Sequence, residues 1–164
     1  MRERGPGSRA GASFDPGVLE RVRPVSGSAA DRRVTLLAIA LGGALGAPAR
    51  YELAQLIHVS KDTFPWATFC TNVSGAFALG LLMTLLGRVP VSRPVAPFLA
   101  VGFLGAYTTF STMAVETTLL AKDGYAGLGA LYLLASVAAG MAAVFSGIAC
   151  ARAIPVKARG GEER

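Results

Sequence analysis

GAYTTFSTM, from Gly105 to Met113, is a polar stretch inside an uncharged run from Pro94 to Val115. Four hydroxyl side chains fall within five consecutive positions, and Phe110 stands in their middle. The run is long enough to cross a bilayer, which takes about 20 helical residues. Irregular backbone at membrane depth persists only where protein buries it or where it lines a wet cavity. We therefore predict a transmembrane helix broken at this stretch, with polar groups that serve a bound or permeating ion.

The composition agrees with a membrane protein. Of 164 residues, 52% are hydrophobic and 16% charged, and the mean hydropathy is +0.49. The formal net charge of +6 resides mostly outside the apolar segments, where basic tails beside membrane spans explain it. A nucleic-acid partner is therefore not expected. The two cysteines, Cys70 and Cys150, form no CxxC or Cys/His cluster, so neither a disulfide framework nor a zinc site is predicted.

Four apolar segments predict four transmembrane helices in an all-α integral membrane protein. Residues 1–33 are expected to be a disordered basic cytoplasmic tail, residues 34–151 the four-helix domain, and residues 152–164 a polar basic tail. The expected spans are 34–57, 65–87, 95–121 (the broken one) and 125–151. The short connections predict that consecutive helices are antiparallel neighbours. Because four short helices enclose little, we expect an oligomer.

Polar side chains inside the spans are the candidate site residues. The Asn72 amide must find hydrogen-bond partners, and Thr68 shares its helix face. Interhelical hydrogen bonding is the alternative to a functional role for Asn72. In the fourth span, Tyr132, Ser136 and Gly140 repeat every four residues and form a one-sided stripe. Hydroxyls bonded to their own helix are the alternative there.

Charged residues inside the spans have two interpretations each. In the third span, Glu116 shares a helical face with Thr109 and Thr112. An intramembrane carboxylate suggests a pore or interface role, and the alternative is a group that reaches the membrane surface. Arg50 is expected near the mouth of a wet vestibule, and the alternative is snorkelling to the interface.

The polar groups fit two kinds of ion. Hydroxyls, an amide, an arginine and the positive edge of the Phe110 ring suit a small anion. Carbonyls freed by a helix break are cation ligands. The composition leaves this choice open.

Three blocks resemble the CrcB/Fluc fluoride channel family. The first is GGALGAPARY, residues 42–51, which is similar to the family's GGxxGAxxRY block. The second runs from Thr68 through Asn72 to Gly75 and Phe77 and is similar to T-x-x-x-N-x-x-G-x-F. The third, GFLGAYTTFST at residues 102–112, is similar to GFxGxxTTFST and is the most specific. The resemblance covers about residues 34–151.

The resemblance implies a dual-topology antiparallel dimer with two narrow fluoride pores that passively export F⁻ and give fluoride resistance. It also implies one structural Na⁺ at the dimer centre, held by the backbone carbonyls of Gly105 and Thr108. The implied pore and track residues are Asn72, Phe110, Met113, Thr112, Ser111, Thr68, Tyr132 and Ser136, with Arg50 at the vestibule. Two positions depart from the family pattern: Met113 replaces the usual second phenylalanine, and Gly140 stands where a serine is often seen.

Two other functional classes compete with this interpretation. A small four-helix proton-coupled multidrug exporter needs a carboxylate deep in the first span, and Glu52 lies too near its end. A non-transporting membrane scaffold subunit gives no reason for the TTFST break. No activated nucleophile, acid–base pair or phosphate loop is apparent, so an enzyme is not expected.

Basic residues predict the orientation in the plasma membrane. With the N-terminus cytoplasmic, ten Lys and Arg near the spans lie inside, whereas only Lys61 and Lys122 lie outside. A chain that inserts both ways should be nearly balanced. The bias favours N-in insertion and, if the dimer is antiparallel, a heterodimer with a related subunit of opposite orientation. A homodimer is the alternative because it is the family's commonest form.

Overall fold

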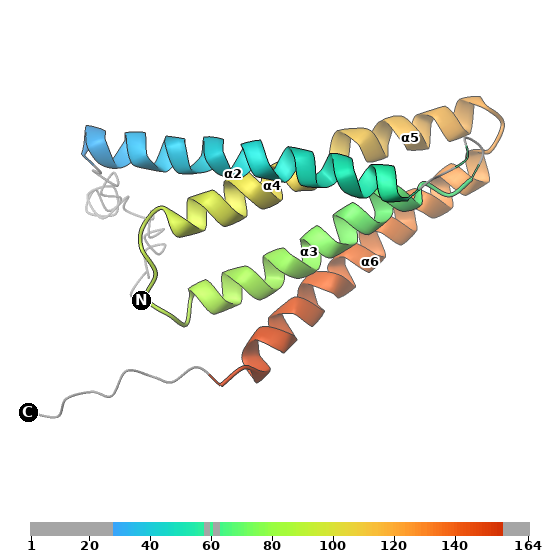
Figure 1. The fold of residues 1–164 in the computed structure, drawn as a ribbon. Helices are drawn as coiled ribbons and strands as arrows, with labels where there is room; N and C mark the ends of the chain where they lie inside the picture. Colours follow the sequence, from blue (N-terminus) through green and yellow to red (C-terminus); the bar gives the residue numbers. More distant parts are fainter. Residues whose placement is uncertain (1–27, 58–59, 61–62, 156–164) are drawn as a thin grey trace, which may run out of the picture.

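The computed structural model describes residues 28–57, 60 and 63–155, and these form long helices joined by short connections (Figure 1). The helices are α2 (Ala29–Leu56), α3 (Trp66–Leu86), η1 (Pro97–Leu104), α4 (Gly105–Tyr107), α5 (Phe110–Lys122) and α6 (Ala126–Ala153). Four segments, Ala29–Leu56, Trp66–Leu86, Pro97–Lys122 and Ala126–Ala153, are long and apolar enough to cross a membrane. The predicted all-α membrane architecture with four spans is thus confirmed.

Helix α2 begins earlier than the sequence suggested. Ser28 and Asp31 form a capping box, in which the Ser28 hydroxyl accepts from the Asp31 N–H at 3.1 Å and the Asp31 carboxylate accepts from the Ser28 N–H at 3.1 Å. This satisfies two free donors at the helix end. Residues 29–33, assigned to the disordered tail, are therefore helical. The rest of that proposed tail, 1–27, lies outside the described residues, as do residues 156–164 of the other tail.

The third segment changes its backbone geometry twice. It begins as the π-helix η1, continues as the single turn α4, and then leaves helical geometry at Thr108 (φ −77°, ψ 158°) and Thr109 (φ −150°, ψ 119°). Helix α5 restarts at Phe110. The irregular residues coincide with the TTFST stretch, at the middle of the segment.

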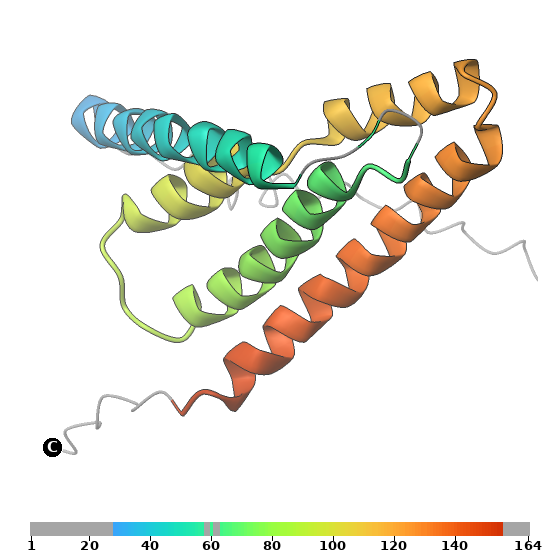
Figure 2. The same ribbon diagram turned by 45° about the vertical axis from the view of Figure 1, so that its right-hand side comes forward.

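Several glycines lie directly against the backbone of the helix that packs on their own. Helix α2 packs on η1 and α4, whereas α3 packs on α6, and α5 packs on α6 (Figures 1 and 2). A Cβ atom at Gly42 or Gly46 would overlap the backbone of η1, and one at Gly80 would overlap the Val144 carbonyl of α6. Gly147 of α6 meets the backbone of α3 in the same way. The expectation that consecutive helices are neighbours holds only weakly for α2 with α3 and for α3 with η1, because each of these pairs makes few contacts.

Many large apolar side chains are exposed, and few are fully buried. Leu36, Leu134 and Phe145 are each about two-thirds exposed, at 65%, 69% and 65%. The described core is small, and Tyr132 is its largest fully buried side chain. Such a surface suits lipid or a protein partner and does not suit water. The chain is therefore a multi-pass membrane protein.

The bundle has two chemically different ends. One end holds the start of α2, the α3–η1 connection and the end of α6, and we call it the α3–η1 end (Figure 2). There the Arg88 guanidinium donates to the Ala151 carbonyl, and Arg93 lies 3.6 Å from the Asp31 carboxylate. The other end, the α5–α6 end, holds the connection before α3 and the turn between α5 and α6. The candidate site lies between these ends.

Candidate functional site

The site is built around the break in the third segment. Thr109 caps α5, because its hydroxyl oxygen accepts from the Thr112 N–H at 3.2 Å. The same hydroxyl donates to the Thr112 hydroxyl at 2.9 Å and lies 3.3 Å from that of Ser111. Thr108 turns its hydroxyl back to the Leu104 carbonyl at 2.9 Å. Hydroxyl groups thus satisfy part of the backbone that the break leaves open.

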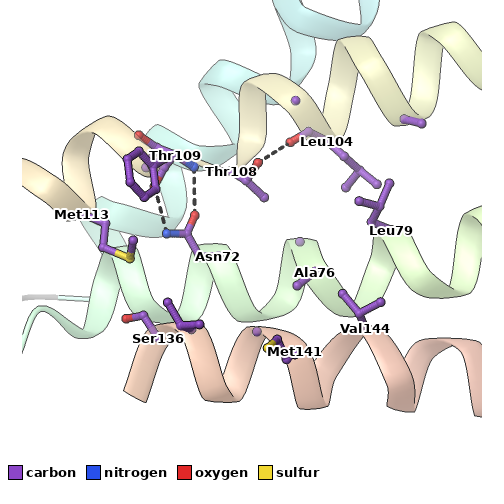
Figure 3. A pocket seen from close by; sticks show the side chains of 16 residues that line it. Asn72, Ala76, Leu79, Leu104, Thr108, Thr109, Met113, Ser136, Met141 and Val144 are labelled. Carbon is purple, nitrogen blue, oxygen red and sulfur yellow. Dashed lines mark hydrogen bonds between the residues drawn. The ribbon is translucent and has the colours of Figure 1, made fainter. Parts of the chain in front are cut away.

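Asn72 holds the break from the neighbouring helix α3. Its Nδ2 donates to the Thr109 carbonyl at 2.9 Å, and its Oδ1 accepts from the Thr109 N–H at 2.8 Å (Figure 3). A single side chain therefore satisfies both backbone groups of one extended residue. The Thr109 backbone is thus the hydrogen-bond partner that the sequence predicted for the Asn72 amide. This pair of bonds favours a structural role for Asn72.

Carbonyls at the break lose their helical partners as a result, and those of Gly105 and Thr108 are among them. In a continuous helix the Thr109 N–H would bond the Gly105 carbonyl and the Thr112 N–H would bond the Thr108 carbonyl. Here the Thr109 N–H bonds Asn72 and the Thr112 N–H bonds the Thr109 hydroxyl. Gly105 is exposed and Thr108 half-buried. These are the two residues that the family resemblance proposes as cation ligands.

A cavity of about 460 Å³ lies beside the break, between α3, α4, α5 and α6 (Figure 3). Its lining is mostly apolar, with a few polar groups near the break. The Ser136 side chain is buried there, and its hydroxyl has no hydrogen-bond partner in the described part of the chain. Of the sequence-predicted residues, the cavity is lined by Asn72, Gly105, Thr108, Phe110, Met113, Ser136 and Gly140.

A second polar cluster lies farther along α5, toward the α5–α6 end. The Glu116 carboxylate accepts from the Thr68 hydroxyl at 2.8 Å through Oε1 and from the Tyr132 hydroxyl at 2.7 Å through Oε2. Thr68 and Tyr132 are buried, and Glu116 is half-buried. Glu116 also lines a separate cavity with Pro65, Leu119 and others. The carboxylate therefore links three helices, and its pore or interface role stays a prediction.

The residues that follow the break face outward. The Phe110 ring is 76% exposed, and Ser111 and Thr112 are exposed as well. Met113, in contrast, is buried at 6% exposure and borders the cavity. The predicted pore residues thus divide into an inward group and an outward group. A path that uses both groups must run along the surface of this chain.

Arg50 lies apart from this assembly. It is half-buried in the last third of α2, borders neither of the two polar cavities, and makes no ion pair within the described residues. Its predicted vestibule role stays a prediction. Within the same residues, no group of three His, Cys, Asp or Glu side chains could hold a metal ion.

Two contacts at the site were missed by sequence reasoning. Ser74 and Tyr107 join their hydroxyls at 2.9 Å across α3 and α4. A Cβ atom at Gly75 would overlap the Thr108 methyl group, so this glycine lets the break approach α3. Gly75 stood in the second motif block, which was the available signal. Ser74 and Tyr107 carry no pattern that links positions so far apart.

Comparisons with known proteins match the same region. A model of the family described as CrcB-like protein, Camphor Resistance (CrcB), matches residues 37–148. The chain is 44% identical over 139 residues to fluoride-specific ion channel FluC 3 of Streptomyces avermitilis, covering 81% of this chain and 68% of that relative. It is 43% identical over 123 residues to FluC 1 of Mycolicibacterium paratuberculosis, covering 74% and 93%. It is 46% identical over 119 residues to FluC 2 of Nocardia farcinica, covering 71% and 84%.

Proposed function

This chain belongs to the CrcB family, and from that membership we propose that it is a fluoride-selective channel through which F⁻ leaves the cytoplasm down its gradient. Its curated relatives are ion channels by name, and the chain is not an enzyme. One observation carries the proposal: the matched region, residues 37–148, contains the break, both polar clusters and the cavity. Passive export would lower internal fluoride and confer fluoride resistance.

The side chains at the break have the chemistry that a small anion requires. The hydroxyls of Ser111, Thr112 and Ser136 offer donors, and the positive edge of the Phe110 ring offers a further contact. The buried Ser136 hydroxyl has no partner within the described residues. An ion or its accompanying water would supply that partner. Met113, beside it, replaces the family's second ring with a polarizable thioether.

The outward position of Phe110 supports a dimer as the conducting unit. In one chain this ring and the hydroxyls of Ser111 and Thr112 are exposed at membrane depth. Within the described residues these two hydroxyls bond only the Thr109 hydroxyl, so a second subunit is expected to cover them and to satisfy their remaining hydrogen-bonding capacity. An antiparallel arrangement would place two such surfaces against each other and enclose two paths.

A sodium ion at the centre of that dimer would suit the freed carbonyls. The Gly105 and Thr108 carbonyls have lost their helical donors, and hard cations prefer oxygen ligands. Bound there, Na⁺ would supply positive charge that stabilises four converging carbonyl dipoles, two from each subunit. The ion would be structural and would not be transported.

The orientation in the membrane is inferred from the unequal distribution of basic residues between the two ends of the bundle. Basic residues at the α3–η1 end include Arg32, Arg33, Arg88, Arg93 and Arg152. This bias favours a cytoplasmic N-terminus and pairing with a related subunit of opposite orientation. We propose this heterodimer over the homodimer. Expression of this chain alone with a C-terminal reporter tests it, because fluoride resistance with reporters on both sides of the membrane would establish the homodimer.

The function itself is tested by reconstitution. The dimer should be purified from cells that express this chain together with its related subunit, or from this chain alone if it proves to be a homodimer. In liposomes loaded with fluoride it should release F⁻ when the counter-ion can follow, and it should release no chloride under the same gradient. A proton-coupled drug exporter would instead change the internal pH of the vesicles when a drug gradient is applied. A scaffold subunit would give neither fluoride release nor a pH change. Fluoride retention by vesicles that demonstrably contain dimeric protein would overturn the proposal.

A further inference from the structure

The connection before α3 carries an aromatic side chain whose placement is set by a tight turn. The Trp66 N–H donates to the Phe64 carbonyl at 2.8 Å, and Pro65 between them has φ −74° and ψ 70°. These angles are those of an inverse γ-turn, which the proline ring favours by holding φ near −65°. The Phe69 N–H then bonds the Pro65 carbonyl and starts α3. Phe64 is thereby held at a fixed position against the start of the helix.

The Phe64 ring packs on the buried Tyr132 ring of α6. Their centroids lie 5.3 Å apart at an interplanar angle of 84°, the favoured edge-to-face arrangement. Phe64 also contacts Phe69 at 5.3 Å and 72° and Trp66 at 4.6 Å and 45°. Among the described ring pairs, Phe64 is the one that joins the α3 aromatic group to Tyr132. Tyr132 itself is 0% exposed.

The position of the Tyr132 ring determines where its hydroxyl points. A phenol oxygen lies on the axis of its ring, so a shift of the ring moves the oxygen by a similar amount. That hydroxyl donates to Glu116 Oε2 at 2.7 Å, a hydrogen bond that weakens steeply with distance and angle. Thr68 holds the other carboxylate oxygen at 2.8 Å. The direction of the Glu116 carboxylate therefore depends on the Tyr132 ring.

We propose that Phe64 is a positioning residue, which holds the Tyr132 phenol against Glu116 and so sets the geometry of the polar cluster at the α5–α6 end. The effect on ion flow rests on the proposed channel function. Phe64 acts only through Tyr132 and does not touch the ion. Pro65 and the γ-turn contribute to this positioning, because they fix where the Phe64 ring lies.

The first test measures fluoride efflux from liposomes for Phe64→Leu. We expect efflux to slow by about three- to tenfold, the factor that corresponds to the free energy of one aromatic pair. The conservative variant Phe64→Trp, which keeps an aromatic ring at this position, should retain normal efflux. Phe69→Leu is the matched control, because Phe69 belongs to the same aromatic group yet makes no ring pair with Tyr132. Efflux should be nearly normal in Phe69→Leu. Equal slowing in both variants would overturn the proposal.

The second test removes the hydroxyl through which Phe64 acts. In a Tyr132→Phe background, Phe64→Leu should cause no further slowing, whereas a purely structural role would slow efflux in both backgrounds. A third measurement needs no ion flow: 3-fluorotyrosine at position 132, observed by ¹⁹F NMR. Its resonance should shift or broaden in Phe64→Leu and stay unchanged in Phe69→Leu. An unchanged resonance in Phe64→Leu would overturn the inference, whereas a shifted resonance without fluoride efflux through the unmodified dimer would overturn only the channel function.

Discussion

Two polar clusters lie along the same helix pair, and one is complete while the other is not. At the α5–α6 end, Glu116 has a hydroxyl donor on each carboxylate oxygen. Beside the break, the Ser136 hydroxyl has no partner in the described residues, and the Phe110 ring is 76% exposed. The first cluster is satisfied within one chain. The second is not satisfied within the described residues, which is compatible with the ion and the second subunit that we propose for this site.

This difference has an energetic meaning. In a membrane a satisfied buried hydrogen bond stabilises modestly, by about 0.6 kcal/mol on average. A polar group left without a partner costs about 1–3 kcal/mol. A closed cluster therefore stabilises the fold and fixes the positions of its own groups, whereas an open cluster favours binding of whatever completes it. Substitutions in the two clusters should have different effects on stability and on ion flow.

The largest expected effect is at the open cluster. Phe110→Ile should abolish fluoride efflux from liposomes while the protein still elutes as a folded dimer, because it removes the ring edge and keeps the apolar volume. Val115→Ile, an exposed position on the same helix, is the matched control and should conduct normally. Near-normal flux through Phe110→Ile would show that the open cluster is not the ion path.

Asn72→Ala should be the most destabilising change at the break. It leaves the Thr109 N–H and carbonyl without partners, at a cost of about 2–6 kcal/mol. Thermal unfolding in detergent, followed by intrinsic fluorescence, measures this loss. Ser74→Ala on the same helix removes a hydrogen bond to Tyr107 but frees no backbone group, so its effect should be smaller. A melting temperature equal to that of the original chain would mean that Asn72 does not hold the break.

Sodium should stabilise the assembled protein without being transported. A ligand at about 100 times its dissociation constant adds about 2.7 kcal/mol to the stability of the state that binds it. We expect a higher melting temperature in sodium chloride than in the chloride salt of a large organic cation, and no uptake of ²²Na⁺ into liposomes. Identical melting curves in the two salts would remove the support for a cation at the Gly105 and Thr108 carbonyls.

A direct comparison of the clusters uses two conservative deletions of a hydroxyl. Tyr132→Phe should lower the free energy of unfolding by about 1 kcal/mol, because it breaks a bond to Glu116. Ser136→Ala should leave stability unchanged or raise it by up to about 1–3 kcal/mol, because it removes a buried hydroxyl that has no partner in the described chain, yet it should slow fluoride efflux. The reverse pattern, with Ser136→Ala the more destabilising change, would contradict the assignment of closed and open clusters.

The smallest effect is expected at Met113, which is buried beside the open cluster. Met113→Phe should retain fluoride transport, because the flexible thioether already fills a space of similar size. Met113→Ala should slow transport by leaving a void. Both rates are measured in the liposome assay at equal dimer content. An inactive Met113→Phe would show that packing around this position has adapted to methionine.

Much of this architecture follows from the sequence. The four spans are set by runs of apolar residues long enough to cross a bilayer, and a run of that kind leaves little choice but a helix. The irregular backbone falls within the TTFST stretch, because Thr109 can cap a new helix with its hydroxyl. The family follows from the same blocks, which the family match contains.

Tertiary structure decided which helices meet and which polar groups become partners. Gly80 and Gly147 looked like ordinary small residues, yet they let α3 pack closely on α6, far apart in sequence. Glu116 was ambiguous by position, and the packing of α3 and α6 around α5 brought Thr68 and Tyr132 to its two oxygens. The physical reason is that hydropathy acts on each segment by itself, whereas close packing and hydrogen bonding depend on the shapes of two surfaces at once.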